Sequence, residues 1–169
     1  NLRVKSGEVL TLIGPNGAGK STILKTITKQ LKILGGAVYI GDTSMSNMRD
    51  SEIARTLSMV MTERLQTELL CGRDVVASGR YPYTGKFGVL SEDDWAKVDE
   101  AIALVHAQDV QDQDFRKMSD GQRQRLMLAR AICQDTDILL LDEPTSYLDM
   151  GFKLDILANI RMLARDRNL

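Results

Sequence analysis

The sequence has little net charge and no long apolar run. Lys and Arg number 22 against 23 for Asp and Glu, which leaves a formal net charge of −1. Domains that bind nucleic acid usually carry a basic excess, so we expect no DNA or RNA partner. No apolar stretch approaches the roughly 20 residues needed to cross a bilayer. The first residues do not resemble a secretion signal. If the protein acts at a membrane, we expect partner subunits to hold it there.

Cysteine and histidine are also scarce. Cys71 and Cys133 lie far apart in the sequence and match no CxxC spacing. We expect both to be reduced thiols that act as small apolar residues. His106, the only histidine, ends a helical pattern, which favours a structural over a catalytic function. The chain also starts without an initiator methionine and stops directly after a helical pattern, so we expect a piece of a longer protein.

Apolar periodicity predicts an α/β chain. Residues 8–13 read as a buried strand, followed by a glycine-rich turn and a helix to about residue 31. Further strands are predicted at 37–40 and 57–61, with a short helix before the second. After residue 117 the α/β texture returns, with a helix at 121–133, a strand at 137–141 and a helix after Met150.

The middle of the chain, residues 62–117, has a helical pattern. Ser91 is a suitable N-cap, and three acidic residues follow it where a helix dipole favours negative charge. Behind them, apolar residues recur at helical spacing and predict one buried face. These residues are Trp95, Val98, Ile102 and Val105.

Residues 14–21 match the pattern GxxxxGK[ST] between a predicted strand and a predicted helix. They are Gly14, Pro15, Asn16, Gly17, Ala18, Gly19, Lys20 and Ser21. Glycines let the backbone curl so that successive N–H groups point at phosphate oxygens, and the helix adds its positive end. Lys20 would reach the β- and γ-phosphates, and the Ser21 hydroxyl would bind Mg²⁺. This pattern predicts an ATP site.

The predicted strand at 137–141 ends in two carboxylates, Asp142 and Glu143. A strand that ends in an acid brings it to the carboxyl edge of the sheet, beside the phosphate loop. Asp142 would hold Mg²⁺, usually through water. Glu143 is placed to polarise the attacking water as general base.

A third motif indicates the family. It reads Met118-Ser119-Asp120-Gly121-Gln122-Arg123-Gln124-Arg125. It resembles the signature of ABC ATPases, LSGGQ followed by QR, and precedes Asp142 by the separation usual in that family. In that family the start of the signature helix contacts ATP held by the opposite subunit. Asp149 resembles the family's D-loop aspartate, which crosses the same interface.

The resemblance covers essentially the whole chain and implies a P-loop NTPase (RecA-like) α/β core with an inserted helical subdomain. The core would comprise residues 1–61 and 118–169, and the insertion residues 62–117. It also implies which residues surround the nucleotide. These are Gly14 to Ser21 with Thr22, and across the dimer interface Ser119, Gly121, Gln122 and Asp149.

A finer resemblance narrows the expected function. Residues 74–83 look like the helical-subdomain sequence of iron-siderophore, haem and cobalamin importer ATPases, in which a GRxP segment precedes an acid-capped helix. The resemblance implies an ATPase at the cytoplasmic face of the membrane that works as a head-to-tail dimer. Its partners would be permease subunits and, indirectly, a substrate-binding protein. The cargo would be a ferric siderophore or a related metal chelate.

The sequence departs from the family pattern at several positions. Asp120 replaces the first signature glycine, so its carboxylate should repel an incoming phosphate unless the side chain points away. The Q-loop glutamine is replaced by Thr62, to which we transfer its role in placing Mg²⁺ and water. The adenine-stacking aromatic and the switch histidine would lie outside the sequence. We therefore expect an open sheet edge beside residues 138–141.

Two alternatives remain at this point. A soluble ABC ATPase of DNA repair or chromosome organisation would carry a long coiled coil between the phosphate loop and the signature. The residues between Lys20 and Ser119 are too few for that insertion and show no heptads. A nucleotide-binding module that never hydrolyses is disfavoured by Glu143 but supported by Thr62 and Asp120.

Overall fold

The computed structural model describes residues 2–61, 69–166 and 168–169. Thr62 lies outside the described residues. The elements in chain order are α1 (Lys20–Ile27), β1 (Tyr39–Ile40), β2 (Thr43–Ser44), the 3₁₀ helix η1 (Met45–Asn47), α2 (Asp50–Thr56), β3 (Leu57–Val60), α3 (Gly72–Ala77), the 3₁₀ helix η2 (Ser78–Tyr83), α4 (Glu92–Leu104), the 3₁₀ helix η3 (Phe115–Lys117), α5 (Asp120–Cys133), β4 (Ile138–Leu141) and α6 (Met150–Asp166).

The strands form two small sheets. β3 and β4 run parallel, with Leu57 opposite Ile138 and Val60 opposite Leu141. The pairing continues one residue further, where the Asp142 N–H donates to the Val60 carbonyl at 3.0 Å. β1 and β2 form an antiparallel hairpin. The strands predicted at 57–61 and 137–141 are therefore confirmed to within one residue at their ends.

The prediction of a strand at residues 8–13 is wrong. This segment belongs to neither sheet of the described residues, and the side chains of Val9, Leu10 and Ile13 are exposed, that of Ile13 to 92%. A strand is held by hydrogen bonds to a neighbour as well as by its own side chains. Among the described strands, β4 pairs only with β3, so its other edge is open, as expected. Residues 8–13 do not pair with this edge or with any other described strand.

The helix after the phosphate loop is shorter than predicted, ending at Ile27 instead of near residue 31. Its end falls in the run Thr26-Ile27-Thr28, whose β-branched side chains lose rotamer freedom in a helix. Lys29 then adopts a left-handed φ of 58°, which a right-handed helix cannot continue through. The strand predicted at 37–40 is also shortened, to its last two residues.

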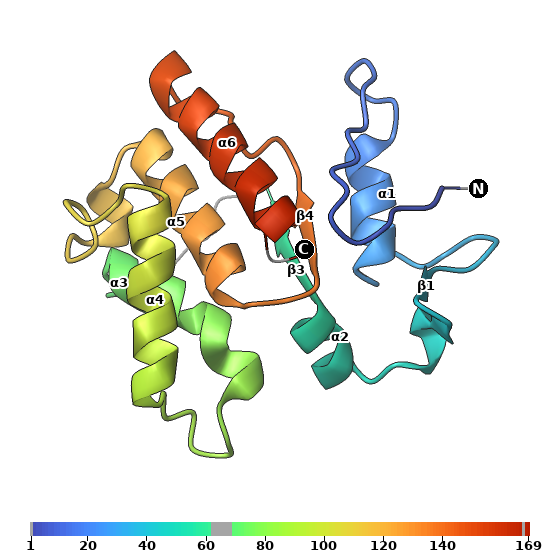
Figure 1. The fold of residues 1–169 in the computed structure, drawn as a ribbon, viewed down its shortest axis with the longest axis horizontal. Coiled ribbons are helices and arrows are strands. Elements are labelled where there is room, and N and C mark those ends of the chain that lie inside the picture. The colour runs from blue at the N-terminus through green and yellow to red at the C-terminus, as the bar shows by residue number, and fades with distance from the viewer. Residues whose placement is uncertain (1, 62–68, 167) are drawn as a thin grey trace.

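Within residues 69–117, the predicted helical pattern is confirmed by α3, η2, α4 and η3. Figure 1 shows α3, α4 and α5 gathered on one side of the β3–β4 pair and α1 on the other. As predicted, Ser91 caps α4, accepting a hydrogen bond from the Asp94 N–H at 3.2 Å. Val98, Ile102 and Val105 are buried in the core, and Trp95 packs against it. This core joins β3, α3, α4, α5 and α6, whereas α1 contributes no buried residue.

A buried arginine ties this helical layer together. Arg80 of η2 is 4% exposed, and its guanidinium donates to Asp94 Oδ1 at 2.8 Å and to the Cys133 carbonyl at 2.8 Å. The Tyr83 ring covers it, with the guanidinium carbon 4.0 Å from the ring centroid. The Ser91 N–H and hydroxyl donate hydrogen bonds to the Asp94 carboxylate, and Arg80 adds a hydrogen bond and a positive charge. Together they lower the pKa of Asp94 to about 2. Arg80 therefore points inward and connects η2, α4 and α5.

Gly79 precedes this arginine at a point where two backbones meet. A Cβ at residue 79 would lie 2.4 Å from the carbonyl oxygen of Arg130 in α5. Backbone atoms of a packed helix cannot yield as a flexible side chain can. The glycine is therefore required by the close approach of η2 to α5.

We predict that Gly79→Ala lowers the free energy of unfolding by about 1–3 kcal/mol, the usual cost of overpacking a well-filled site. Denaturant titration followed by circular dichroism measures it. Gly85→Ala is the matched control, because a Cβ at Gly85 meets nothing within 4 Å. It should change stability by less than about 0.5 kcal/mol. Equal effects of the two substitutions would contradict the packing argument.

Candidate functional site

The glycine-rich turn before α1 forms an open loop. Gly17 and Gly19 have φ values of 83° and 89°, and a Cβ at either would meet nothing within 4 Å. Backbone conformation, not lack of space, therefore selects glycine at these two positions. Lys20 Nζ donates to the carbonyl oxygens of Gly14 at 2.9 Å and Pro15 at 3.0 Å. The ammonium group thus lies across the start of the loop.

The loop leads directly into the positive end of a helix. α1 begins at Lys20, and its first turn contains no acidic residue. Its first N–H groups and its dipole are therefore not opposed by a carboxylate of the same turn. Together with the lysine, they form a site suited to phosphate oxygens.

Ser21 and Asp142 meet beside this loop, although 121 residues separate them in the sequence. The Ser21 hydroxyl donates to Asp142 Oδ1 at 3.0 Å. Asp142 is 5% exposed and is held by the bond of its N–H to Val60 at the end of β3. A hydroxyl and a carboxylate are hard oxygen ligands of the kind Mg²⁺ prefers, so the residues fit the predicted metal. No cluster of three or more His, Cys, Asp or Glu suited to a metal occurs among the described residues.

Glu143 follows at the same edge of the sheet but in a different conformation. Its φ of 50° is left-handed, and its side chain is exposed. The Ser146 hydroxyl donates to Glu143 Oε2 at 3.1 Å, and the Ser146 N–H donates to the Glu143 carbonyl at 3.1 Å. The carboxylate is therefore oriented by a residue three positions later in the same turn.

The signature residues start α5 with a capping box. Ser119 Oγ accepts a hydrogen bond from the Gln122 N–H at 3.2 Å, and Gln122 Oε1 accepts one from the Ser119 N–H at 2.8 Å. Asp120 Oδ1 accepts from Arg123 Nη1 at 3.3 Å within the same helix. The Asp120 carboxylate is thus directed along the helix toward a cation.

The segment after Glu143 packs against the start of α5. Gln124 Nε2 donates to the Pro144 carbonyl at 3.1 Å. A Cβ at Gly121 would lie 3.1 Å from the Tyr147 carbonyl oxygen. Asp149 Oδ1 accepts a hydrogen bond from the Phe152 N–H at 3.1 Å, near the start of α6.

No function was predicted for Gln124, although it belongs to the signature motif, or for Ser146. The spacing of Ser146 from Glu143 could have indicated a local side-chain contact. Gln124 has no local signal, because its partner lies 20 residues further along the chain.

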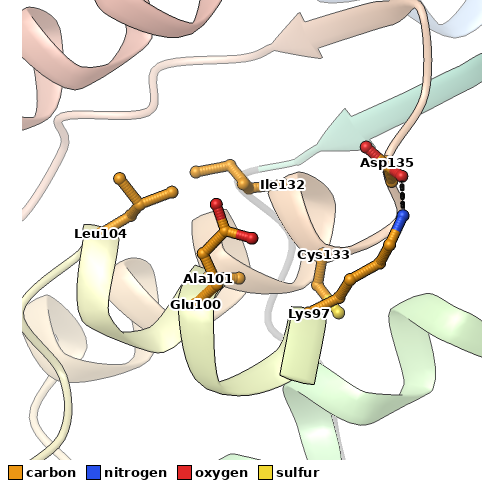
Figure 2. Close-up of a pocket in the computed structure, with 7 residues that line it drawn as sticks. All are labelled: Lys97, Glu100, Ala101, Leu104, Ile132, Cys133 and Asp135. Carbon is orange, nitrogen blue, oxygen red and sulfur yellow. Dashed lines mark hydrogen bonds and ion pairs between the residues drawn. The ribbon is translucent and has the colours of Figure 1, made fainter. Parts of the chain in front are cut away.

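Two cavities lie away from the phosphate loop. One, of about 150 Å³, lies between α4 and the end of α5, where Lys97 forms an ion pair with Asp135 (Figure 2). Its wall includes Cys133, whose pKa is raised to about 12 by burial, so the thiol stays protonated at neutral pH. The other, of about 260 Å³, is bordered by Ser58, Thr136 and Leu163 among others. Neither includes a residue of the predicted ATP site.

Comparison with known proteins places the chain in a family. The family described as ABC transporter matches residues 1–146. The chain is 44% identical over all its residues to an uncharacterized ABC transporter ATP-binding protein of Methanocaldococcus jannaschii, of which it covers 58%. It is 35% identical to the iron(3+)-hydroxamate import ATP-binding protein of Bacillus subtilis, with 99% of the chain and 62% of that protein covered. The chain thus spans less than two thirds of the length of both.

Solved structures agree in fold. A dimeric ATP-binding cassette in a post-hydrolysis state bound to ADP and phosphate superposes with a TM-score of 0.86 at 26% identity, covering 99% of this chain and 74% of that one. A metal-chelate type ABC transporter in an inward-facing conformation superposes at 0.81 and 25% identity, covering 98% of this chain and 62% of that one. The chain therefore belongs to the ABC transporter family and has the P-loop NTPase fold of its ATP-binding cassettes.

Proposed function

We propose that the protein is the ATP-binding and ATP-hydrolysing subunit of an ABC importer for a ferric siderophore or a related metal chelate. The observation that carries the ATPase proposal is the contact of Ser21 with the buried Asp142, beside a loop that Lys20 spans. The cargo proposal is supported by the relatives, since one is an iron(3+)-hydroxamate import protein and another an achromobactin transport protein of Dickeya dadantii.

Each residue of the site has a distinct task in this proposal. Residues 14–19 and the start of α1 bind the phosphates of ATP through backbone N–H groups, with Thr22 in the first turn. Lys20 exchanges its two carbonyl partners for the β- and γ-phosphates. Ser21 and Asp142 hold Mg²⁺, which neutralises phosphate charge when bound. Glu143 accepts a proton from the attacking water as general base. Thr62, outside the described residues, would help to place this water.

The remaining site residues serve a dimer in this proposal. Ser119, Gly121 and Gln122 offer the start of α5 to the γ-phosphate held by the opposite subunit, and Asp149 crosses the same interface. The dimeric cassette among the structural relatives supports a second copy as partner. Ser119 and Gln122 cap each other in this structure through their oxygens, which leaves the Ser119 hydroxyl and the Gln122 NH2 group as donors for phosphate.

The division of the chain follows the same proposal, with a core at 1–61 and 118–169 and a helical subdomain at 62–117. The helical subdomain docks on permease subunits at the cytoplasmic face of the membrane, and a substrate-binding protein acts indirectly. No helix of the described residues is long and apolar enough to span a membrane. Tyr81, 62% exposed beside the inward-pointing Arg80, is the residue of 74–83 best placed to touch a permease.

We predict that Lys20→Ala weakens binding of Mg-ATP about 10- to 100-fold, because it removes the side-chain cation aimed at the phosphates. Isothermal titration calorimetry on the complete protein measures it. Lys32→Ala, at an exposed position beyond α1, is the control and should bind as the parent does. Equal affinity of Lys20→Ala and the parent would refute the phosphate site.

Glu143→Gln should keep ATP binding but lower turnover about 10²- to 10⁴-fold, the usual contribution of a general base. It should also accumulate an ATP-bound dimer, because the triphosphate that joins the two subunits is not consumed. Phosphate release and size-exclusion chromatography with ATP measure the two effects. Asp155→Asn, an exposed acid on α6, serves as control. Turnover within a few-fold of the parent would show that Glu143 is not the base.

The transport proposal predicts uptake of ferric siderophore by vesicles that contain the protein with its permease and binding protein. Tyr81→Ala should reduce uptake and co-purification with the permease, while ATP hydrolysis by the separate subunit is unchanged. Phe87→Ala, an even more exposed aromatic outside residues 74–83, should have little effect. Uptake of an unrelated sugar or amino acid would overturn the cargo, and failure to bind any permease would favour a soluble ABC ATPase.

A further inference from the structure

The turn that carries Glu143 contains two left-handed residues that are not glycine. Glu143 has a φ of 50° and Tyr147 a φ of 65°. This conformation crowds the Cβ against the following carbonyl, so residues with side chains rarely adopt it without support. The surroundings must therefore hold this turn in place.

Bonds within the turn define its shape but not its location. Ser146 bonds to the carbonyl and to the carboxylate of Glu143, and the Leu148 N–H donates to the Thr145 carbonyl at 3.4 Å. At one end, Asp142 is tied to β3, and at the other Asp149 caps the start of α6. Between these two ends, Leu148 is buried in the apolar core, and the start of α5 contacts the backbone of the turn.

Two residues in the first turns of α5 meet this segment next to its left-handed residues. Gln124 is 8% exposed, and its amide donates to the carbonyl of Pro144, which directly follows Glu143. Gly121, one helical turn earlier, lies against the carbonyl of Tyr147. A buried amide that has one fixed partner is held in position, because breaking the bond would leave both groups unsatisfied.

We infer that Gln124 is a positioning residue for Glu143, and that α5 sets where the carboxylate stands relative to the nucleotide of its own chain. This inference rests on the proposed function, in which Glu143 is the base. The start of the same helix faces the partner's nucleotide in that proposal. One helix would therefore connect two catalytic centres, contacting one with Ser119 and aligning the other through Gln124.

The chain offers a matched control at the opposite end of this helix. Gln134 follows the end of α5, and its amide donates to the carbonyls of Ala54 at 2.6 Å and Leu57 at 3.2 Å, away from the turn. Gln124→Met and Gln134→Met each keep side-chain length and remove one amide that bonds to backbone. Both should therefore lower thermal stability, but only the first should disturb Glu143.

The experiment measures steady-state ATP hydrolysis by the complete protein. Gln124→Met should lower kcat about 10- to 100-fold, as expected when a catalytic group is displaced by about 1 Å, and should leave KM within about threefold. Gln134→Met should retain the parent's kcat. A kcat for Gln124→Met equal to that of Gln134→Met would overturn the inference.

A double variant tests whether Gln124 acts through Glu143. In the Glu143→Gln background, Gln124→Met should cause no further loss, because the group that it positions is already gone. Multiplicative losses would show that Gln124 acts on something else and would overturn the inference. The single variant Glu143→Gln separates the two proposals, because turnover near that of the parent would refute Glu143 as base, whatever Gln124 does.

A measurement that does not depend on catalysis tests the inference even if a variant is inactive because it folds poorly. Hydrogen exchange of peptides from residues 143–149 should quicken in Gln124→Met and in the isosteric Gln124→Glu, whose carboxylate cannot donate to Pro144. Exchange in these peptides should stay at the parent's rate in Gln134→Met. Unchanged exchange in Gln124→Glu would show that the amide does not hold the turn.

Discussion

The parallel pairing of β3 with β4 is the constraint on which the candidate site depends. It ends with the Asp142 N–H bonded to the Val60 carbonyl, which fixes the carboxylate at the edge of the pair. Ser21 reaches this carboxylate from the first turn of α1, which itself buries no residue in the core. The phosphate loop is thus joined to the rest of the fold through polar contacts, whereas the apolar core lies under α3–α6.

α5 organises the opposite side of the molecule. Near its end, the Arg130 carbonyl lies against Gly79, and the Cys133 carbonyl accepts from Arg80. Near its start, Gly121 and Gln124 meet the turn after Glu143. The helix therefore touches the segment proposed to meet the permease at one end and the segment proposed to activate water at the other.

The sequence predicted features that are encoded locally. Ser91 with Asp94 and the apolar residues behind them specified α4, and the pattern at 14–21 indicated a phosphate loop. The contact of Ser21 with Asp142 also agrees with the prediction, because Asp142 directly follows β4, which brings its carboxylate beside the phosphate loop. The prediction of a strand at residues 8–13 was wrong because apolar periodicity describes a side-chain pattern, whereas a strand also needs a neighbour to which its backbone is hydrogen-bonded.

The contacts that escaped sequence analysis are those between distant segments. Gly79 is required by the approach of the Arg130 carbonyl, which no local pattern indicates. The left-handed φ of Glu143 likewise has no signal in a residue type that usually avoids it. No periodicity records such contacts, since each depends on how two elements cross.

Arg80 has a mechanical consequence for η2. A buried ion pair often stabilises a fold no better than apolar side chains of similar volume would. Its bonds to Asp94 and Cys133 are nevertheless directional, with fixed lengths and angles, whereas apolar contacts allow sliding and repacking. A displacement of Tyr81 or Pro82 would therefore be passed to the end of α5 through Arg80, because these bonds lose strength when their geometry is distorted.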